Sequence, residues 1–173
     1  MTPSRILDAA LALLEERGLA ALTMRALARR LGADPMAVYH YYRDKNALLE
    51  AAAERAFAAL RPRLPVRGSW RAKLHALARA YLRFLHRSGE LLRFVVASPR
   101  ASTRASPRFD ELFFAIVAPL KLPKRHAMAS RDALVDQLHG CSLASESYDP
   151  TAALDVLFAG MATYGATSSR RSL

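Results

Sequence analysis

The sequence predicts an all-α protein built from two helical units. Apolar residues recur at three- and four-residue spacing through most of the 173 residues, and no segment shows the alternation of a β-strand. Glycine and proline residues separate these amphipathic stretches, as they commonly do at helix ends. The composition, 52% hydrophobic and 24% charged, agrees with a globular protein that has a real core.

The N-terminal unit contains a helix-turn-helix pattern at about residues 23–42. Thr23 is a suitable N-cap, and apolar residues follow it at helical spacing. Gly32 lies where this helix would end, because glycine adopts the left-handed conformation without strain. Asp34 can then cap a second helix, with Pro35 at its first position, where a missing N–H costs nothing. Two helices joined by about four residues, with a glycine in the turn, form this motif.

The second helix is predicted over about residues 35–42. At 100° per residue, Pro35, Val38 and Tyr42 share a side that can pack on the preceding helix. The opposite side points outward and carries small or polar groups, with a phenol hydroxyl on each flank. These outward residues are Met36, Ala37 and His40, flanked by Tyr39 and Tyr41. Such a surface fits a DNA major groove, where its centre can meet base edges and its flanks can reach phosphates.

Lys45 gives a separate indication of a nucleic-acid partner. Asp44 is the predicted N-cap of the next helix, so the Lys45 ammonium lies in the first turn, where it opposes the helix dipole by up to about 1 kcal/mol. A DNA phosphate at this helix start would reverse the sign, because the backbone N–H groups and the ammonium would both favour it. The alternative is an ordinary solvated lysine.

Four stretches in the first third of the chain agree, in order and spacing, with a known family. They are ILDAALALLEERG at residues 6–18, LTMRALARRLG at 22–32, AVYHYY at 37–42 and DKNALL at 44–49. Through them, the chain resembles the DNA-binding domain of the tetracycline-repressor (TetR) family of bacterial regulators as far as about residue 57. The resemblance implies a homodimeric, all-helical transcription factor whose N-terminal three helices bind double-stranded DNA. In such proteins a larger helical domain dimerises and often binds a small-molecule effector.

The resemblance also implies DNA contacts at nine positions. Phosphate-contact positions correspond to Thr23, Tyr39, Tyr41 and Lys45, base-facing positions to Pro35, Met36, Ala37 and His40, and a base or phosphate position to Arg25. The family more often has histidine at Tyr41 and phenylalanine at Tyr42; Tyr41 keeps a hydrogen-bonding tip, and Tyr42 is expected in the core. Apolar Met36 and Ala37 can touch thymine methyl groups but cannot form bidentate base contacts. We therefore expect hydrogen-bonded readout from Arg25 and His40, the alternatives being a surface charge and a solvated imidazole.

Proline and glycine between residues 62 and 68 predict a domain boundary, with a DNA-binding domain at residues 1–62 and a dimerisation and effector domain at 63–173. In the first domain, helices are expected at about residues 4–17, ending at Gly18, and 45–61. In the second domain, helices are expected at about residues 70–87, 90–97, 109–120, 124–144 and from Asp149 to 164, with a loop at 98–107.

The formal net charge is +11, and residues 67–108 hold ten Lys and Arg against one acid. The predicted helix at 70–87 carries a basic stripe at four-residue spacing: Arg71, His75, Arg79, Arg83 and Arg87. This stripe either contacts an anionic ligand or DNA, or is a solvated helix face, as most charge stripes are. The basic region also keeps open an alternative function, a non-specific or nucleoid-like nucleic-acid-binding protein.

The last two long helices have wide apolar faces with small residues, which the resemblance assigns to a homodimer interface. The alternative is that these faces close the core of one subunit. An effector pocket is expected among Trp70, Tyr81, Phe84, Phe94, Phe113 and Phe114. Aromatic residues at helical spacing are also typical of an ordinary core.

Sequence patterns of catalysis and metal binding are absent. None of the five histidines forms an HxxxH or HExxH pair, and there is no zinc-type Cys/His cluster, P-loop or GxSxG elbow. Cys141 is the only cysteine, no apolar run reaches membrane-spanning length, and the N-terminus lacks a signal-peptide pattern. We expect a cytoplasmic repressor, not an enzyme, with no metal, cofactor or membrane partner, released from a near-palindromic operator by an effector.

Overall fold

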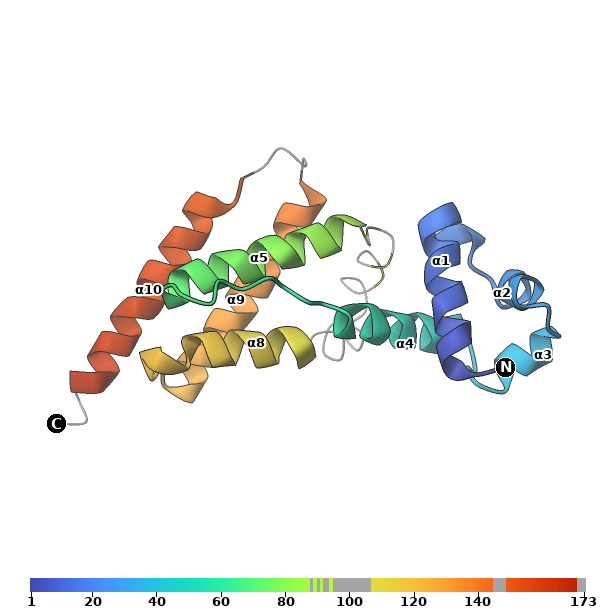
Figure 1. Ribbon diagram of the computed structural model, residues 1–173, viewed down its shortest axis with the longest axis horizontal. Helices are drawn as coiled ribbons and strands as arrows, with labels where there is room; N and C mark the ends of the chain where they lie inside the picture. The colour runs from blue at the N-terminus through green and yellow to red at the C-terminus, as the bar shows by residue number, and fades with distance from the viewer. Residues whose placement is uncertain (88, 90, 92–93, 95–106, 145–148, 171–173) are drawn as a thin grey trace. The chain divides into compact units, whose positions relative to one another are not determined.

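The computed structural model describes residues 1–87, 89, 91, 94, 107–144 and 149–170, with side chains as far as Gly165 in the last stretch (Figure 1). All the secondary structure in this described part is helical, which confirms the all-α prediction. The chain divides into two compact units: Met1–Ala59 with Ser88–Pro107, and Leu60–Arg87 with Arg108–Leu173. None of the described helices is long and apolar enough to cross a membrane.

The described stretch Met1–Ala59 of the first unit contains α1 (Pro3–Ala21), α2 (Met24–Leu31), α3 (Pro35–Tyr39) and α4 (Lys45–Ala58). Helix α1 packs against α2 and α4, and α2 packs against α3. Their apolar faces meet in a core whose fully buried members include Ile6, Leu22, Leu27, Val38 and Leu48. Helix α1 is interrupted at its predicted end, Gly18, whose φ of +74° and ψ of 177° are not helical, and helical backbone then resumes as far as Ala21. Helix α4 ends three residues early, ahead of the proline-containing linker.

The second unit contains α5 (Trp70–Arg87), α8 (Pro107–Val117), the short 3-10 turn η1 (Ala118–Leu120), α9 (Lys124–Leu143) and α10 (Thr151–Arg170). Helix α5 packs against α9 and α10, which also pack against each other. The core of this unit is aromatic as well as aliphatic. Its fully buried members include Leu74, Leu77, Tyr81, Phe109, Phe113, Leu134, Leu138 and Phe158.

The predicted helix bounds of the second unit are confirmed for α5 and, within one residue, for α9 (Lys124–Leu143); α8 and α10 differ from their predicted ends. The segment predicted as one helix at 109–120 ends its α-helix at Val117 and finishes as a 3-10 turn, with Lys121 left-handed at φ +50°. Helix α10 begins after Asp149 as predicted and extends to Arg170, six residues beyond the expected end. The predicted helix at 90–97 and loop at 98–107 lie largely outside the described residues; Gly89, Leu91 and Phe94 are helical.

Local side-chain caps explain where several helices begin. Thr23 Oγ1 accepts a hydrogen bond from the Ala26 N–H at 3.0 Å, and Asp34 Oδ1 accepts one from the Met36 N–H at 2.7 Å. Asp149 Oδ1 accepts from the Thr151 N–H at 2.9 Å. Each cap satisfies a backbone donor that the first helical turn leaves unpaired. The turn between α2 and α3 depends in addition on Gly32, whose φ of +64° is left-handed.

We expect Gly32→Ala to lower the free energy of unfolding by about 1 kcal/mol, because an L side chain is strained in the left-handed region. A Cβ atom there would meet nothing within 4 Å, so crowding does not contribute. Gly32→Asn is the matched control, since asparagine tolerates this conformation, and should recover most of the loss. Urea unfolding at 25 °C measures all three proteins. Equal stability of Gly32→Ala and the unchanged chain would contradict the account of the turn.

Candidate nucleic-acid interface

The turn between α2 and α3 is closed by backbone hydrogen bonds around Gly32. The Gly32 N–H donates to the Arg29 carbonyl at 3.2 Å, and the Ala33 N–H donates to the Ala28 carbonyl at 3.0 Å. These bonds satisfy carbonyls that the end of α2 would otherwise leave unpaired. The chain then turns immediately into the Asp34 cap of α3. The geometry is the predicted helix-turn-helix, built by the predicted residues.

Helix α3 has one buried side and one exposed side. Val38 is fully buried, whereas Met36 is 72% exposed and His40 is exposed. Tyr39 and Tyr41, on the flanks, are 43% and 40% exposed. The regular helix ends at Tyr39, shorter than predicted, although His40 keeps a right-handed helical backbone. An exposed helical surface that mixes apolar and polar side chains in this way can enter a DNA groove.

Tyr41, which follows His40, has two fixed neighbours. The Tyr41 hydroxyl donates a hydrogen bond to the Met1 carbonyl at 2.9 Å, and the His40 ring stands edge-on to the Tyr41 ring at 5.3 Å. Tyr42 is half-buried, and desolvation raises the pKa of its phenol. The flank of α3 is therefore joined to the start of the chain, a contact between residues 40 positions apart that no local pattern indicates.

Lys45 is neither a freely solvated lysine nor an isolated cation at a helix start. Its Nζ donates a hydrogen bond to the Leu19 carbonyl at 2.7 Å, which joins the start of α4 to the last turn of α1. Asp44 caps α4 by accepting from the Ala47 N–H at 2.7 Å, and this bond lowers the pKa of the Asp44 carboxyl. The ammonium has three donors, so two N–H groups remain beyond the bond to Leu19.

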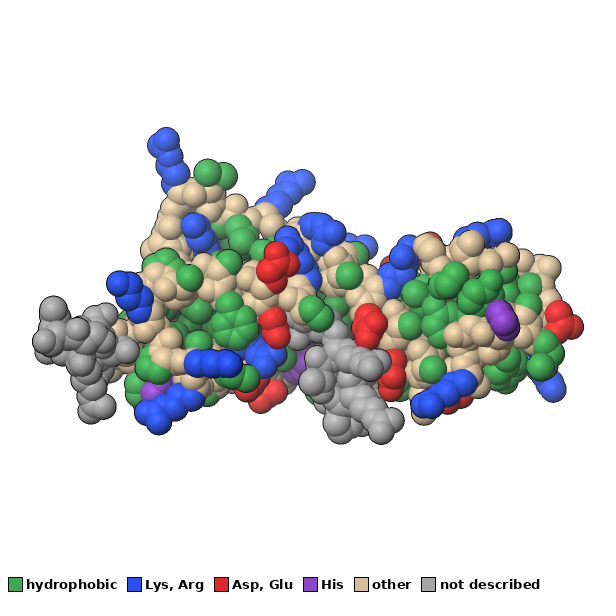
Figure 2. Space-filling view, turned by 90° about the horizontal axis from the view of Figure 1, so that it is seen from below, with side chains coloured by type: hydrophobic (Ala, Val, Ile, Leu, Met, Phe, Trp, Pro, Cys, Tyr) green, Lys and Arg blue, Asp and Glu red, His purple; other side chains and the backbone are tan. Residues whose placement is uncertain are grey.

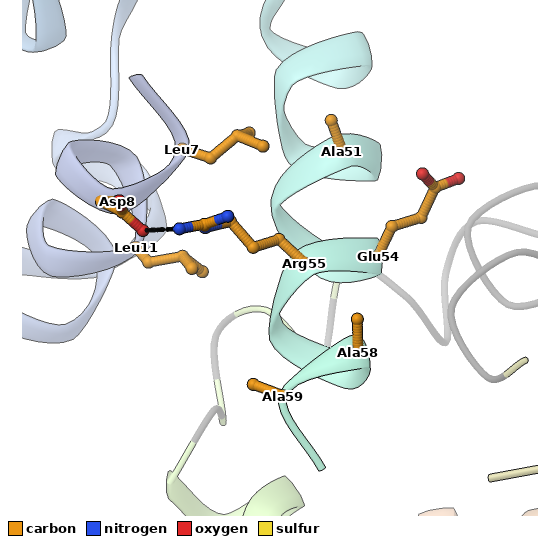
Figure 3. A pocket seen from close by; sticks show the side chains of 8 residues that line it. All are labelled: Leu7, Asp8, Leu11, Ala51, Glu54, Arg55, Ala58 and Ala59. Atoms are coloured by element: carbon orange, nitrogen blue, oxygen red, sulfur yellow. Dashed lines mark hydrogen bonds and ion pairs between the residues drawn. The ribbon is translucent and has the colours of Figure 1, made fainter. Parts of the chain in front are cut away.

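Two ion pairs join α1 to its neighbours. Arg30 of α2 makes a two-pronged contact with Glu16 of α1, both N–O distances being 2.6 Å, and these hydrogen bonds lower the pKa of Glu16. Arg55 of α4 reaches Asp8 of α1 at 2.6 Å across an open hollow of about 690 Å³ (Figure 3). Sequence analysis missed both pairs, because their partners lie 14 and 47 residues apart. These ion pairs hold α1 against α2, which precedes the turn, and against α4, which follows α3.

The six residues predicted to form an effector pocket lie in different surroundings in the structure. Tyr81 and Phe113 are buried in the core of the second unit, Phe114 is 36% exposed, and Phe94 belongs to the first unit. Tyr81 packs against Phe109 at 4.7 Å between ring centroids, and its hydroxyl lies 3.1 Å from His139 Nε2. Burial raises the pKa of Tyr81 and lowers that of His139. The half-buried Trp70 packs edge-on against Phe158, and Phe84 is half-buried beside Tyr81.

The basic stripe on α5 is only partly a solvated face. His75 Nε2 lies 2.9 Å from Asp155 Oδ1 of α10, and the Arg71 guanidinium lies over the Trp70 ring at 4.8 Å from its centroid. Arg79, Arg83 and Arg87 are exposed. Figure 2 shows Lys and Arg side chains projecting at several places from both units, without one continuous basic patch on this view.

Curated proteins similar to this chain are transcriptional repressors. Residues 6–52 match the family model described as bacterial regulatory proteins, tetR family. The tetracycline repressor protein class A from transposon 1721 of Escherichia coli is 48% identical over 54 residues, which cover 31% of this chain and 25% of that protein. The HTH-type transcriptional repressor DrrR1 of Streptomyces coeruleorubidus is 29% identical over 123 residues, 70% of this chain and 45% of that protein. The chain thus spans less than half the length of these relatives.

Solved structures share the fold over almost the whole chain. BioQ with its natural double-stranded DNA operator superposes with a TM-score of 0.77 at 23% identity, covering 94% of this chain and 99% of BioQ. A TetR protein of Acinetobacter baumannii AYE, a single-residue variant in complex with minocycline, gives a TM-score of 0.70 at 26% identity and covers 98% and 97%. Residues 6–52, which hold the helix-turn-helix, therefore match the tetR family of bacterial regulatory proteins, and both units share the fold of the TetR protein solved with minocycline.

Proposed function

We propose that this protein is a sequence-specific DNA-binding transcriptional regulator, a repressor, that places α3 in the DNA major groove. The observation that carries the proposal is that one side of α3 is buried and the opposite side is exposed. Val38 is fully buried and anchors the helix, while Met36 is 72% exposed and His40 is exposed beside it. The exposed side chains of α3 therefore do not pack in the core, and their chemical groups suit contacts with base edges.

The proposed contacts are of two kinds: phosphate contacts that position the protein on DNA, and base contacts that recognise the sequence. Thr23, Tyr39, Tyr41 and Lys45 would bind phosphates and fix the register, Tyr41 by exchanging its bond to the Met1 carbonyl for one to a phosphate. The base-facing residues would be Arg25, Pro35, Met36, Ala37 and His40. The tether between Lys45 and Leu19 supports a phosphate role, because it holds the ammonium at the start of α4 before DNA arrives. On this proposal, residues 1–62 form the DNA-binding domain and residues 63–173 the dimerisation and effector domain.

The exposed faces of the last two helices support a homodimer. On α10, Val156 is 75% exposed and Tyr164 is 52% exposed, and exposed Ala159 and Gly160 lie between them. On α9, Met128 and Leu143 are 42% and 59% exposed. Exposed large apolar side chains next to small residues let two helices approach closely, so both faces suit a symmetric interface between two copies.

Effector control is the third part of the proposal. Related folds have been solved with small molecules: ActR of Streptomyces coelicolor with actinorhodin, and the Acinetobacter protein with minocycline. A dimer must match two half-sites at a fixed spacing on the duplex, so a ligand that changes the separation of the two α3 helices would release the operator. In this chain, such a ligand would bind residues 63–173.

A second candidate, non-specific nucleic-acid binding through residues 67–108, rests on the exposed Arg79, Arg83 and Arg87. Much of that region lies outside the described residues. The two candidates differ in what they require of DNA. Phosphate binding through a basic stripe shows little sequence preference and a strong dependence on salt, whereas base readout by α3 requires a defined sequence.

Selection of bound duplexes from a random DNA library, at near-physiological salt, tests the proposed function. We expect a two-fold symmetric motif from the unchanged protein. On the recovered duplex, Arg25→Ala and His40→Ala should each weaken binding by about fivefold or more and relax one base position, as loss of a base contact does. Arg83→Ala is the matched control on α5 and should change affinity less than twofold. Recovery of no motif, or a large loss only in Arg83→Ala, would contradict the proposal and favour the second candidate.

Val156→Glu should disrupt the proposed dimer, because a carboxylate within an apolar interface loses hydration without gaining a partner. We expect the dimer dissociation constant from sedimentation equilibrium to rise at least tenfold, about 1.4 kcal/mol. Val66→Glu introduces the same charge at a residue that is 96% exposed in the linker, and should leave the constant unchanged. A monomeric unchanged protein, or a Val156→Glu variant as dimeric as the control, would refute the interface.

A further inference from the structure

The second unit contains an open, solvent-facing cavity of about 520 Å³, which none of the six aromatic residues predicted for the effector pocket lines. Its walls come from three places in that unit: the linker before α5, one side of α5, and the start of α10. The lining residues are Arg63, Leu64, Pro65, Ala72, His75, Ala76, Arg79 and Thr151. Cavities of about 300 to 1,000 Å³ are the usual size for small-molecule sites.

The shape of the cavity follows from helix geometry and a folded linker. On α5, residues at spacings of three and four share one side, which places Ala72, His75, Ala76 and Arg79 together. Because alanine is short, space remains between the two longer side chains. A Cβ atom at Gly68 would lie 3.7 Å from the Ala72 side chain and 3.8 Å from Pro65, so the linker lies close against α5.

The charges around the cavity favour an anion. Within the described part of the chain, neither the Arg63 nor the Arg79 guanidinium has an ion-pair partner. Two carboxylates lie near the cavity without lining it. Asp155 is paired with His75 at 2.9 Å, and Asp149, which stays charged, accepts from the Thr151 N–H and hydroxyl at 2.9 and 2.6 Å. No acidic residue is among the eight that line the cavity. Arginine presents a planar fork of donors that matches a carboxylate or a phosphate.

We propose that this cavity binds a small organic anion, whose carboxylate or phosphate group is held by Arg63 and Arg79. The apolar part of the ligand would lie against Leu64, Pro65 and Ala76. This assignment gives Arg79 of the basic stripe a role in the second unit itself. Binding at this site does not require the proposed DNA-binding function, so each can fail without the other.

The test is calorimetric titration of the full chain with benzoate and with benzamide, its neutral isostere, at near-physiological ionic strength. We expect benzoate to bind at least fivefold more tightly than benzamide. Arg63→Gln and Arg79→Gln, which keep much of the side-chain length and remove the charge, should each weaken benzoate binding at least fivefold. Arg83→Gln removes an exposed charge one turn further along α5, outside the cavity lining, and should change it less than twofold. Equal thermal unfolding temperatures establish that the variants are folded.

Inorganic phosphate, added as a competitor, distinguishes the two head groups. Displacement of benzoate by phosphate identifies a site that accepts both, and failure of displacement identifies a carboxylate site; either outcome supports the proposal. Three results would overturn it: no benzoate binding, equal binding of benzamide, or equal loss in Arg83→Gln. DNA affinity, measured on the duplex from the selection experiment, should be unchanged in Arg79→Gln. Loss of DNA binding with intact benzoate binding would assign this arginine to nucleic acid instead.

Discussion

Helix α3 is five residues long, so its orientation depends on its packing against α2. An isolated segment of this length does not stay helical in water, because one turn fixes several dihedral angles for very few hydrogen bonds. Val38, buried completely, supplies the apolar anchor, and the left-handed Gly32 sets the angle at which the chain leaves α2. The outward residues of α3 can recognise DNA only because that anchor and that turn hold the helix in one place.

The position of α3 also depends on how α2 is held by the other helices of the first unit. Arg30 ties α2 to α1 through Glu16, and Arg55 ties α4 to α1 through Asp8. Surface ion pairs of this type contribute little to stability individually. They restrict the relative positions of α1, α2 and α4, whose apolar faces already pack together in the core of the unit. The bond from Lys45 to Leu19 does the same for the start of α4, where a phosphate contact is proposed.

Features of the first unit that depend on local interactions could be predicted from the sequence. The caps Thr23, Asp34 and Asp44 and the turn at Gly32 each act within four residues, so their types and spacing were sufficient to predict the helix-turn-helix. The break of α1 at Gly18 could likewise be predicted from the glycine, whereas the short helical stretch that follows it to Ala21 could not.

The contacts that sequence analysis missed join residues far apart in the chain. Tyr81 and His139 are 58 positions apart, and His75 and Asp155 are 80 apart, so no periodic pattern relates them. The same reason explains the anion cavity, where Arg63 and Arg79 come together only because the linker folds against α5. The arginine stripe on α5 can be recognised in the sequence. The linker and the start of α10, which make Arg79 part of a cavity, cannot be placed beside it from the sequence.

The central claim is that two copies of α3 read neighbouring major grooves from a fixed scaffold. Hydroxyl-radical footprinting of the protein on a duplex recovered by selection tests it most directly. The account predicts two protected stretches on one face of the duplex, related by two-fold symmetry, with centres about 10 base pairs apart. Continuous protection along the duplex, or a single asymmetric stretch, would contradict it.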